Sequence, residues 1–126
     1  MVPDLIYDIG IHDGDDTAYY LYKGYRVVAV DADPIMVDLC KQRFAEEIRT
    51  GRLVILNVGI GRTREILRFW LHKWNRPWSS FNRNPEWRDE DCEIINIQCI
   101  PFTEIIAAYG VPFYLKIDIE GADGLH

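Results

Sequence analysis

The stretch YDIGIHDGDD, residues 7–16, decides which fold and which kind of ligand the chain is expected to have. An apolar run leads into Asp8, and Gly10 and Gly14 then bracket a short turn. A glycine turn directly after a buried strand is a usual ligand-binding place in an open parallel sheet. The stretch therefore predicts a strand, a ligand-binding turn and a following helix.

The acids around this turn restrict the ligand. The spacing is GxxxG, and the dinucleotide fingerprint GxGxxG is absent. A pyrophosphate near Asp13, Asp15 and Asp16 would meet a repulsion of roughly a few kcal/mol, and the turn itself holds no Lys or Arg. Calcium would need the EF-hand spacing, which is missing, so no metal is expected. The pattern favours a ligand without phosphate that carries positive groups, and S-adenosylmethionine fits this description.

Beyond the turn, strand patterns alternate with helix patterns. Residues 26–30 (RVVAV) are apolar and mostly β-branched, as in a parallel strand covered on both faces. Asp15 or Asp16 is expected to cap the first helix, and Thr103 the last. The alternation predicts an α/β fold with a mostly parallel sheet and right-handed crossovers. The expected strands are 4–9, 26–30, 53–58, 65–71, 93–100 and 112–119, and the expected helices are 17–23, 34–49 and 103–109.

Polar residues follow each of the central strands. Because the carboxyl ends of parallel strands meet at one edge of a sheet, these segments are expected to surround one site. Asp31, at the end of the second strand, lies where an acid accepts hydrogen bonds from ribose hydroxyls. The four segments are residues 8–16, 31–34, 57–61 and 118–121.

Length and composition indicate one soluble domain. The chain has 126 residues and 48% hydrophobic residues, enough for a packed core. No apolar segment approaches the roughly 20 residues that span a bilayer, and the start does not resemble a signal peptide. The three cysteines lack CxxC spacing, so reduced, partly buried thiols and a cytoplasmic location are expected.

Residues 62–88 differ in charge from the rest of the chain. They hold seven Arg or Lys against two Glu, a net charge of +5, while the whole chain has −6. All four tryptophans of the chain, Trp70, Trp74, Trp78 and Trp87, lie in this segment among its basic residues. Such a segment can pack a hairpin on the sheet, cover a substrate or bind nucleic acid through stacking. The negative net charge argues against a dedicated nucleic-acid binder.

The motifs YDIGIHDGDDTAYYL, VVAVDADP, LVILNVGIG, WSSF and LKIDIEGAD occur in this order. In that order they resemble the landmarks of FkbM-type methyltransferases, which are class I, S-adenosylmethionine-dependent enzymes. The resemblance covers nearly the whole chain, and KIDIEGAD is its most specific part. It implies a Rossmann-like class I methyltransferase sheet with an inserted β-hairpin, and O-methyl transfer to a small-molecule or sugar hydroxyl.

The resemblance also assigns residues to roles. Asp118 ends the strand that faces the transferred methyl and is the expected catalytic residue, since a general base would help a hydroxyl acceptor. The alternative is a structural acid that accepts hydrogen bonds from the N–H groups at the start of the following helix. Glu120 and Trp78 are the expected substrate contacts, although Glu120 could instead pair with Lys116 or cap the following helix. Lys116 is expected to be a salt-bridge partner at the strand end. The cofactor-binding residues would be Asp8, Gly10, Ile11, His12, Gly14, Asp31, Ala32, Asn57, Val58 and Ser80, with Ser79 as the partner of Ser80 in the family's serine pair.

The chain departs from the family pattern at two places. It has His12 and Asp13 where the family usually has small residues or Asn, and Asp31-Ala32 where the family often has Glu-Pro. His12 would contact substrate or cofactor, whereas His72 is expected to face solvent on the hairpin.

The family fold also continues through further strands, which this chain lacks. Residues 1–126 are therefore interpreted as one methyltransferase-like domain, the N-terminal, cofactor-binding part, with its last strands missing. The strand at 112–119 would have an open edge, which can serve self-association. The alternative function is a non-catalytic α/β module that binds a partner through residues 62–88 or through this edge.

Overall fold

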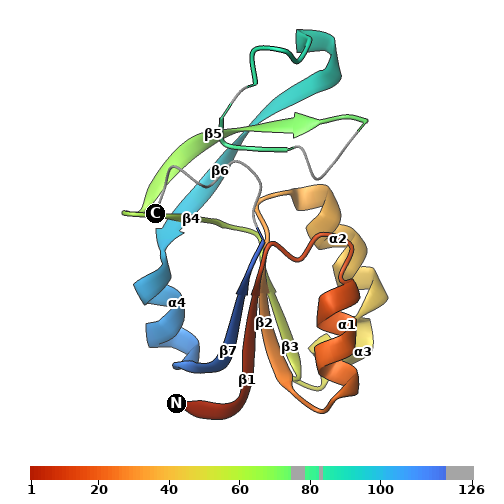
Figure 1. The fold of residues 1–126 in the computed structure, drawn as a ribbon, viewed down its shortest axis with the longest axis vertical. Helices are drawn as coiled ribbons and strands as arrows, with labels where there is room; N and C mark the ends of the chain where they lie inside the picture. The colour runs from red at the N-terminus through yellow and green to blue at the C-terminus, as the bar shows by residue number, and fades with distance from the viewer. Residues whose placement is uncertain (75–78, 83, 119–126) are drawn as a thin grey trace.

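A computed structural model describes residues 1–74, 79–82 and 84–118 of the chain. A four-stranded parallel sheet forms its lower half, with the strand order β3-β2-β1-β7 (Figure 1). Every pairing in this sheet is parallel, which confirms the predicted α/β fold with a mostly parallel sheet. The bounds of the strands are Val2–Ile9 for β1, Arg26–Val30 for β2, Leu53–Leu56 for β3 and Pro112–Ile117 for β7.

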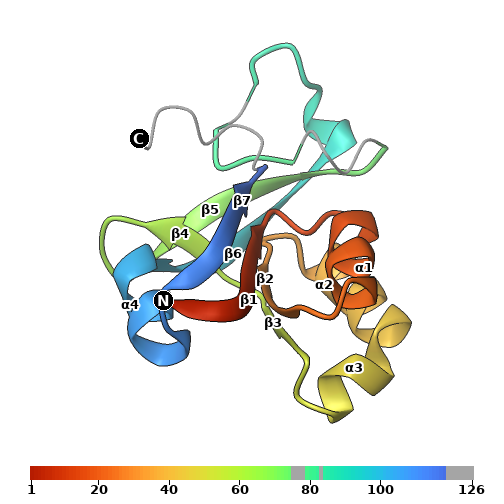
Figure 2. The same cartoon turned by 60° about the horizontal axis from the view of Figure 1, so that its bottom comes forward.

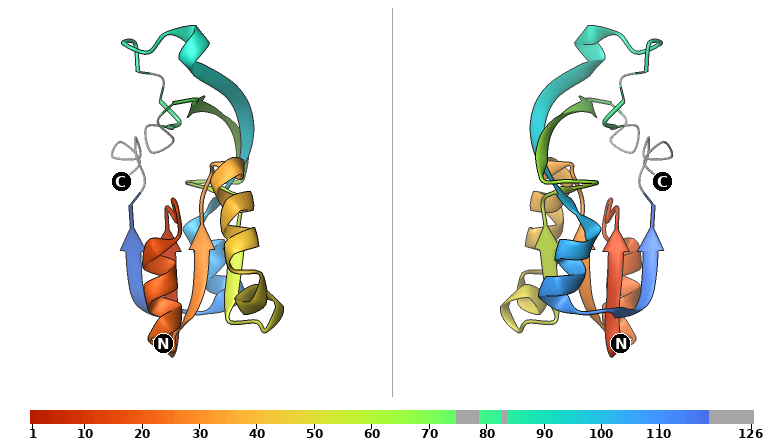
Figure 3. Two further views of the ribbon diagram at one scale, coloured as in Figure 1. Left: turned by 90° about the vertical axis from the view of Figure 1, so that its right-hand side faces the viewer. Right: turned by 90° about the vertical axis from the view of Figure 1, so that its left-hand side faces the viewer.

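Helices cover both faces of this sheet (Figures 2 and 3). One face carries α1 (Asp15–Tyr22), α2 (Pro34–Arg43) and α3 (Ala45–Arg49), and the other carries α4 (Phe102–Tyr109). Alternate residues of β2 enter the two cores, since Val27 and Ala29 join the cluster beneath α1–α3 while Val28 and Val30 join the cluster beneath α4. Burial on both faces explains why this strand reads as a continuous apolar run.

The predicted helix over residues 34–49 is wrong in one respect, because it is two helices. The chain leaves helical geometry at Phe44, whose φ and ψ are −112° and 29°. The Phe44 side chain is buried in the core and lies against the glycine turn, so a tertiary contact interrupts the helix.

Two predicted helix caps are also wrong. Helix α1 begins after Gly14, which has a positive φ of 89°, and no side chain caps it. Helix α4 begins one residue before Thr103, with Pro101 at the cap position and again no side-chain cap. Asp33 does cap α2, since its carboxylate accepts hydrogen bonds from the Ile35 and Met36 N–H groups.

A second sheet stands above the carboxyl ends of the parallel strands (Figure 1). It has the order β4-β6-β5, with β4 at Gly59–Gly61, β5 at Glu65–His72 and β6 at Cys92–Pro101. The antiparallel pairing of β5 with β6 agrees with the expected hairpin, and a short 3-10 helix, η2 (Asp89–Asp91), precedes β6.

The predicted third strand, 53–58, is shorter than expected. Strand β3 ends at Leu56, and the chain crosses to the upper sheet as β4. Gly59 allows this crossing, because a Cβ there would lie 2.5 Å from Cζ of Phe81 and 2.8 Å from Sγ of Cys99.

Strand β7 lies at one edge of the four-stranded sheet in the described part of the chain. Phe113, Tyr114, Leu115 and Ile117 along it are 38–54% exposed, so its apolar side chains are only half covered. Cys40 and Cys99 are buried thiols, which agrees with the expectation of buried cysteines. None of the described helices is long and apolar enough to cross a membrane.

Candidate functional site

The glycine turn connects β1 to α1 at the carboxyl edge of the parallel sheet. Gly10 and Gly14 both have φ of 89°, a left-handed conformation that favours glycine. At Gly14 a side chain would also collide with the core, because a Cβ would lie 2.7 Å from Cε2 of Phe44. The Ile11 side chain is buried in the same core, beneath α1–α3. The turn therefore offers mainly its backbone to a ligand.

Asp8 is fully buried at the base of this turn. Its Oδ2 accepts a hydrogen bond of 2.6 Å from the Thr17 hydroxyl in the first turns of α1. Its Oδ1 has no hydrogen-bond partner within the described residues, and Nζ of Lys116 lies 3.7 Å away. Burial raises the pKa of Asp8, while the Thr17 bond and the Lys116 charge oppose that rise. A buried carboxyl oxygen that accepts no hydrogen bond fits a ligand that brings a hydrogen-bond donor.

Asp31 follows β2 and is held by two backbone donors. Its Oδ2 accepts from the His12 N–H at 3.1 Å and its Oδ1 from the Asp33 N–H at 2.9 Å. Burial raises the pKa of Asp31, and these two N–H bonds limit the rise. Asn57 fixes the same segment, because its Nδ2 donates to the backbone oxygens of Asp31 and Ala32 at 3.0 and 3.1 Å. The structure thus brings Asp31, Ala32 and Asn57 together next to the glycine turn, as the sequence predicts.

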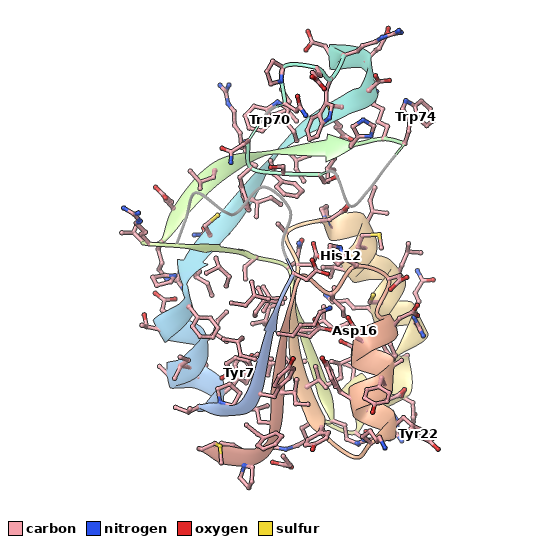
Figure 4. All side chains as sticks on the ribbon, viewed as in Figure 1. Tyr7, His12, Asp16, Tyr22, Trp70 and Trp74 are labelled. Atoms are coloured by element: carbon pink, nitrogen blue, oxygen red, sulfur yellow. The ribbon has the colours of Figure 1, made fainter. Side chains whose placement is uncertain are left out.

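His12 lies at the centre of the carboxyl edge, below the upper sheet (Figure 4). It is a non-glycine residue with a positive φ, 51°. Its Nε2 is 2.8 Å from the backbone oxygen of Asp118 and 3.6 Å from Oδ2 of the same residue. The thiol of Cys40, whose pKa burial raises to about 11, donates to the His12 carbonyl oxygen at 3.4 Å. The ring thereby links the glycine turn to the end of β7.

Lys116 is the cation among these acids. Its Nζ donates to Oδ2 of Asp16 and lies 3.7 Å from Oδ1 of Asp8 and 3.9 Å from Oδ2 of Asp118. Burial acts to lower the pKa of Lys116, but the bond to Asp16 and the nearby carboxylates raise it overall. This confirms the expected salt bridge at the strand end. We call Asp8, His12, Asp16, Asp31, Lys116 and Asp118 the strand-end cluster.

Basic residues from other elements reach the glycine turn, and the sequence analysis of the charges in the turn did not predict them. Arg43 of α2 donates to the Asp13 carbonyl oxygen at 2.8 Å and to Asp15 Oδ1 at 2.9 Å. Together with Lys116 it offsets part of the negative charge that the turn carries alone. No local signal could have found either contact, since Arg43 and Lys116 are far from the turn in sequence.

The remaining predicted cofactor residues lie around this cluster or above it. Val58 is partly buried against the core beneath α4, and Ala32 packs against Phe69 and Leu71 of the upper sheet. Ser80 is buried within the hairpin, and its Oγ accepts from the Asn82 N–H at 3.0 Å. Its role in cofactor binding stays a prediction. Glu120 and Trp78, predicted to contact substrate, lie outside the described residues.

His72 is a correction to the sequence analysis, which expected it to face solvent. It is only 6% exposed. The Ser79 hydroxyl accepts from its backbone N–H at 2.9 Å, and the Trp87 ring lies 5.3 Å from its imidazole ring. The segment that folds back over β5 buries it.

Comparison with known proteins bears on the fold and on the family of the chain. The model of the family described as methyltransferase FkbM domain matches residues 8–124. The crystal structure of methyltransferase FkbM from Methylobacillus flagellatus KT is similar, with a TM-score of 0.62 at 19% sequence identity. The match covers 97% of this chain and 27% of that one, so the chain spans about a quarter of that protein's length. No curated protein matches the chain. On its match over residues 8–124, the chain belongs to the FkbM methyltransferase domain family.

Proposed function

We propose that the chain binds S-adenosylmethionine at the strand-end cluster and, as part of a methyltransferase, directs its methyl group to a hydroxyl of a small molecule or sugar. The observation that carries the proposal is the placement of Asp31. Its carboxylate is fixed by the N–H groups of His12 and Asp33, directly beside the glycine turn. An acid in this position of an open parallel sheet is suited to ribose hydroxyls.

The other residues of the turn suit the rest of the cofactor. Gly10 and Gly14 allow the left-handed backbone of the turn, which presents backbone groups to a ligand at the carboxyl edge. Oδ1 of Asp8, which accepts no hydrogen bond from a described residue and lies 3.7 Å from Nζ of Lys116, gives a buried carboxyl oxygen at the base of the turn. Ala32, Asn57 and Val58 would border the adenine, since they follow β2 and β3 at the same edge. When bound, S-adenosylmethionine supplies an electrophilic methyl group on a sulfonium.

Asp118 is the proposed proton acceptor for the hydroxyl of the methyl acceptor. It directly follows β7, its side chain is 56% exposed, and its N–H bonds to the Ile9 carbonyl oxygen at 2.8 Å. That bond holds it against the end of β1, next to the glycine turn. Orientation of the acceptor supplies much of the catalysis in methyl transfer, and a base at this edge would remove the hydroxyl proton.

The half-exposed edge of β7 favours a second candidate function, which is binding to another protein strand or a second copy of the chain. Phe113 and Ile117 are 52% and 54% exposed, and the edge has unpaired backbone groups on its open side in the described part of the chain. An edge of this kind can accept a further strand. This function needs no cofactor.

Calorimetric titration of S-adenosylmethionine and S-adenosylhomocysteine into the chain tests the first proposal. We expect micromolar binding of both ligands that Asp31→Ala abolishes. Asp38→Ala is the matched control, because Asp38 is an exposed acid on the nearby helix α2. A folded chain that binds neither ligand, or equal loss in both variants, would contradict the proposal. Concentration-dependent sedimentation together with absent ligand binding would favour the second candidate.

A further inference from the structure

His12 occupies a position where a change in its charge acts on the residues that face the ligand. Its backbone N–H holds Asp31, and its ring reaches the end of β7. The positive form of His12 attracts the carboxylates of both Asp8 and Asp31. In the proposed function, Asp8 lies at the base of the turn and Asp31 accepts hydrogen bonds from the ribose hydroxyls.

The His12 ring can gain a proton without losing its hydrogen bond. The Nε2–H donates to the Asp118 backbone oxygen at 2.8 Å in both the neutral and the charged form. Nδ1 has no hydrogen-bond partner within residues 1–74, 79–82 and 84–118. The side chain is 29% exposed, so solvent can deliver the proton. Protonation therefore adds a unit charge with little need for the ring to move.

A proton on His12 changes the balance of charge at the site. The surrounding groups come from β1, α1, α2, β7 and the segment after β2, and they comprise four carboxylates, one ammonium and one buried thiol. These groups are Asp8, Asp31, Asp118, Lys116 and Cys40, together with Asp16, which pairs with Lys116. A positive His12 places a second cation in the site beside Lys116 and competes for the acids that would attract a cationic ligand.

We propose that His12 determines the preference of this site between the positively charged methyl donor and its uncharged sulfide product. The inference rests on the proposed function. S-adenosylmethionine and S-adenosylhomocysteine differ by one methyl group and by the charge on sulfur, and otherwise carry the same groups. Neutral His12 leaves the carboxylates available to the sulfonium. Protonated His12 repels the sulfonium and leaves the product sulfide nearly unaffected, so acid shifts the site from donor to product.

The test is calorimetric titration of both ligands at several values between about pH 5.5 and 7.2, below the ordinary pKa of an α-amino group. We expect the affinity for S-adenosylmethionine to fall about tenfold across this range, the effect of one partly screened charge near the ligand. The affinity for S-adenosylhomocysteine should change less than about threefold. In His12→Asn the ratio of the two affinities should stay constant with pH.

His12→Asn is a suitable variant because Asn readily adopts a positive φ, and His12→Gly serves as a second one without steric strain. Both variants keep Asp8, Asp31 and Asp118, so any pH dependence that remains belongs to those acids. The imidazole signal of His12, followed by NMR, should titrate together with the loss of donor affinity.

Three results would overturn the proposal. One is a ratio of the two ligand affinities that changes with pH in both variants as it does in the original chain. Another is a ratio that does not change in the original chain. The third is a folded chain that binds neither ligand at any pH, which would overturn the proposed cofactor site as well and is thereby distinguished from the other two.

Discussion

The strand-end cluster and the segment 79–82 of the upper hairpin both hold buried polar side chains, but they hold them differently. In the hairpin, the Ser79 hydroxyl accepts from the His72 N–H and the Ser80 hydroxyl from the Asn82 N–H. In the strand-end cluster, the fully buried Asp8 keeps one oxygen without a hydrogen bond from any described residue. The neutral serine hydroxyls of the hairpin accept hydrogen bonds from nearby backbone groups, whereas one oxygen of Asp8 in the cluster accepts none from a described residue.

This difference separates residues that build the fold from residues that are available to a ligand. A buried hydroxyl whose bonds are complete contributes to stability and has little left to offer. A buried carboxylate with an open position costs stability, and such a cost is common at binding sites. One buried group in the hairpin resembles the cluster, since Nε1 of Trp70 has no partner within the described residues. The comparison can be tested by changing each region and measuring stability and ligand binding separately.

The largest effect is expected from Gly14→Ala. The substitution forces a side chain into a conformation with φ of 89° and drives its Cβ to 2.7 Å from the Phe44 ring. Left-handed strain and overpacking together should lower the free energy of unfolding by about 3 kcal/mol. Gly24→Ala is the control, because Gly24 has φ of 95° with no atom within 4 Å of the added Cβ, and should cost about 1 kcal/mol. Urea unfolding measures both, and equal costs would show that Phe44 does not restrict the turn.

A smaller effect, confined to the upper sheet, is expected from Leu71→Ala. Leu71 is 2% exposed and belongs to a small core with Phe69 and Ile97. The loss should be about 2 kcal/mol, near the lower end for a buried leucine, because so small a core can partly collapse. Ile66→Ala on the same strand is the control, since Ile66 is 66% exposed. Hydrogen exchange should show faster opening of β5 and β6 with β1 and β2 unchanged. Equal acceleration in both sheets would mean that the two regions unfold together.

The sequence predicts the lower region better than the upper one, for physical reasons. Strand β2, Arg26–Val30, has the predicted bounds, because residues 27–30 are buried on both faces and give a continuous apolar run in the local sequence. The glycine turn and Asp31 are likewise local features of strand ends. His72 was misjudged, because the segment with Ser79 and the Trp87 ring bury it from outside its own strand.

Within the site, contacts between distant residues escaped the sequence analysis. Lys116 bonds to Asp16 across 100 positions, and Arg43 reaches Asp15 across 28 positions. Neither spacing leaves a periodic signal. The break at Phe44 has the same origin, because the contact of its ring with Gly14 exists only once the turn has folded.

A pH-dependent effect is expected from Asp8→Asn. Burial raises the pKa of Asp8, so the folded state binds its proton more tightly than the unfolded chain does. The stability linked to this proton is fully present below about pH 3.9, the ordinary pKa of aspartate, and is lost as the pH rises through the raised pKa. Asn keeps an oxygen for the Thr17 hydroxyl and carries no charge. The variant should therefore be more stable than the original chain at pH 7, and this gain should shrink as the pH falls toward 4.

Urea unfolding from pH 7 to pH 4 measures the gain, and Asp38→Asn on α2 serves as the exposed control. The same Asp8→Asn variant should bind S-adenosylmethionine more weakly at pH 7, because the buried charge at the base of the turn is gone. A loss of stability at pH 7 together with unchanged binding would assign Asp8 to the fold, like the serines of the hairpin.

The smallest effects provide the sharpest comparison, because two substitutions of similar cost should differ in binding. Asn57→Ala removes two hydrogen bonds that hold the backbone of Asp31 and Ala32, and Ser79→Ala removes the acceptor of the buried His72 N–H. Each should lower the free energy of unfolding by about 1 kcal/mol. Only Asn57→Ala should weaken binding of S-adenosylhomocysteine, by about threefold to tenfold, because the Asp31 carboxylate is then less well fixed. Calorimetry and urea unfolding of both variants check this. Equal weakening would mean that the hairpin turn shapes the ligand site as directly as the ends of the parallel strands do.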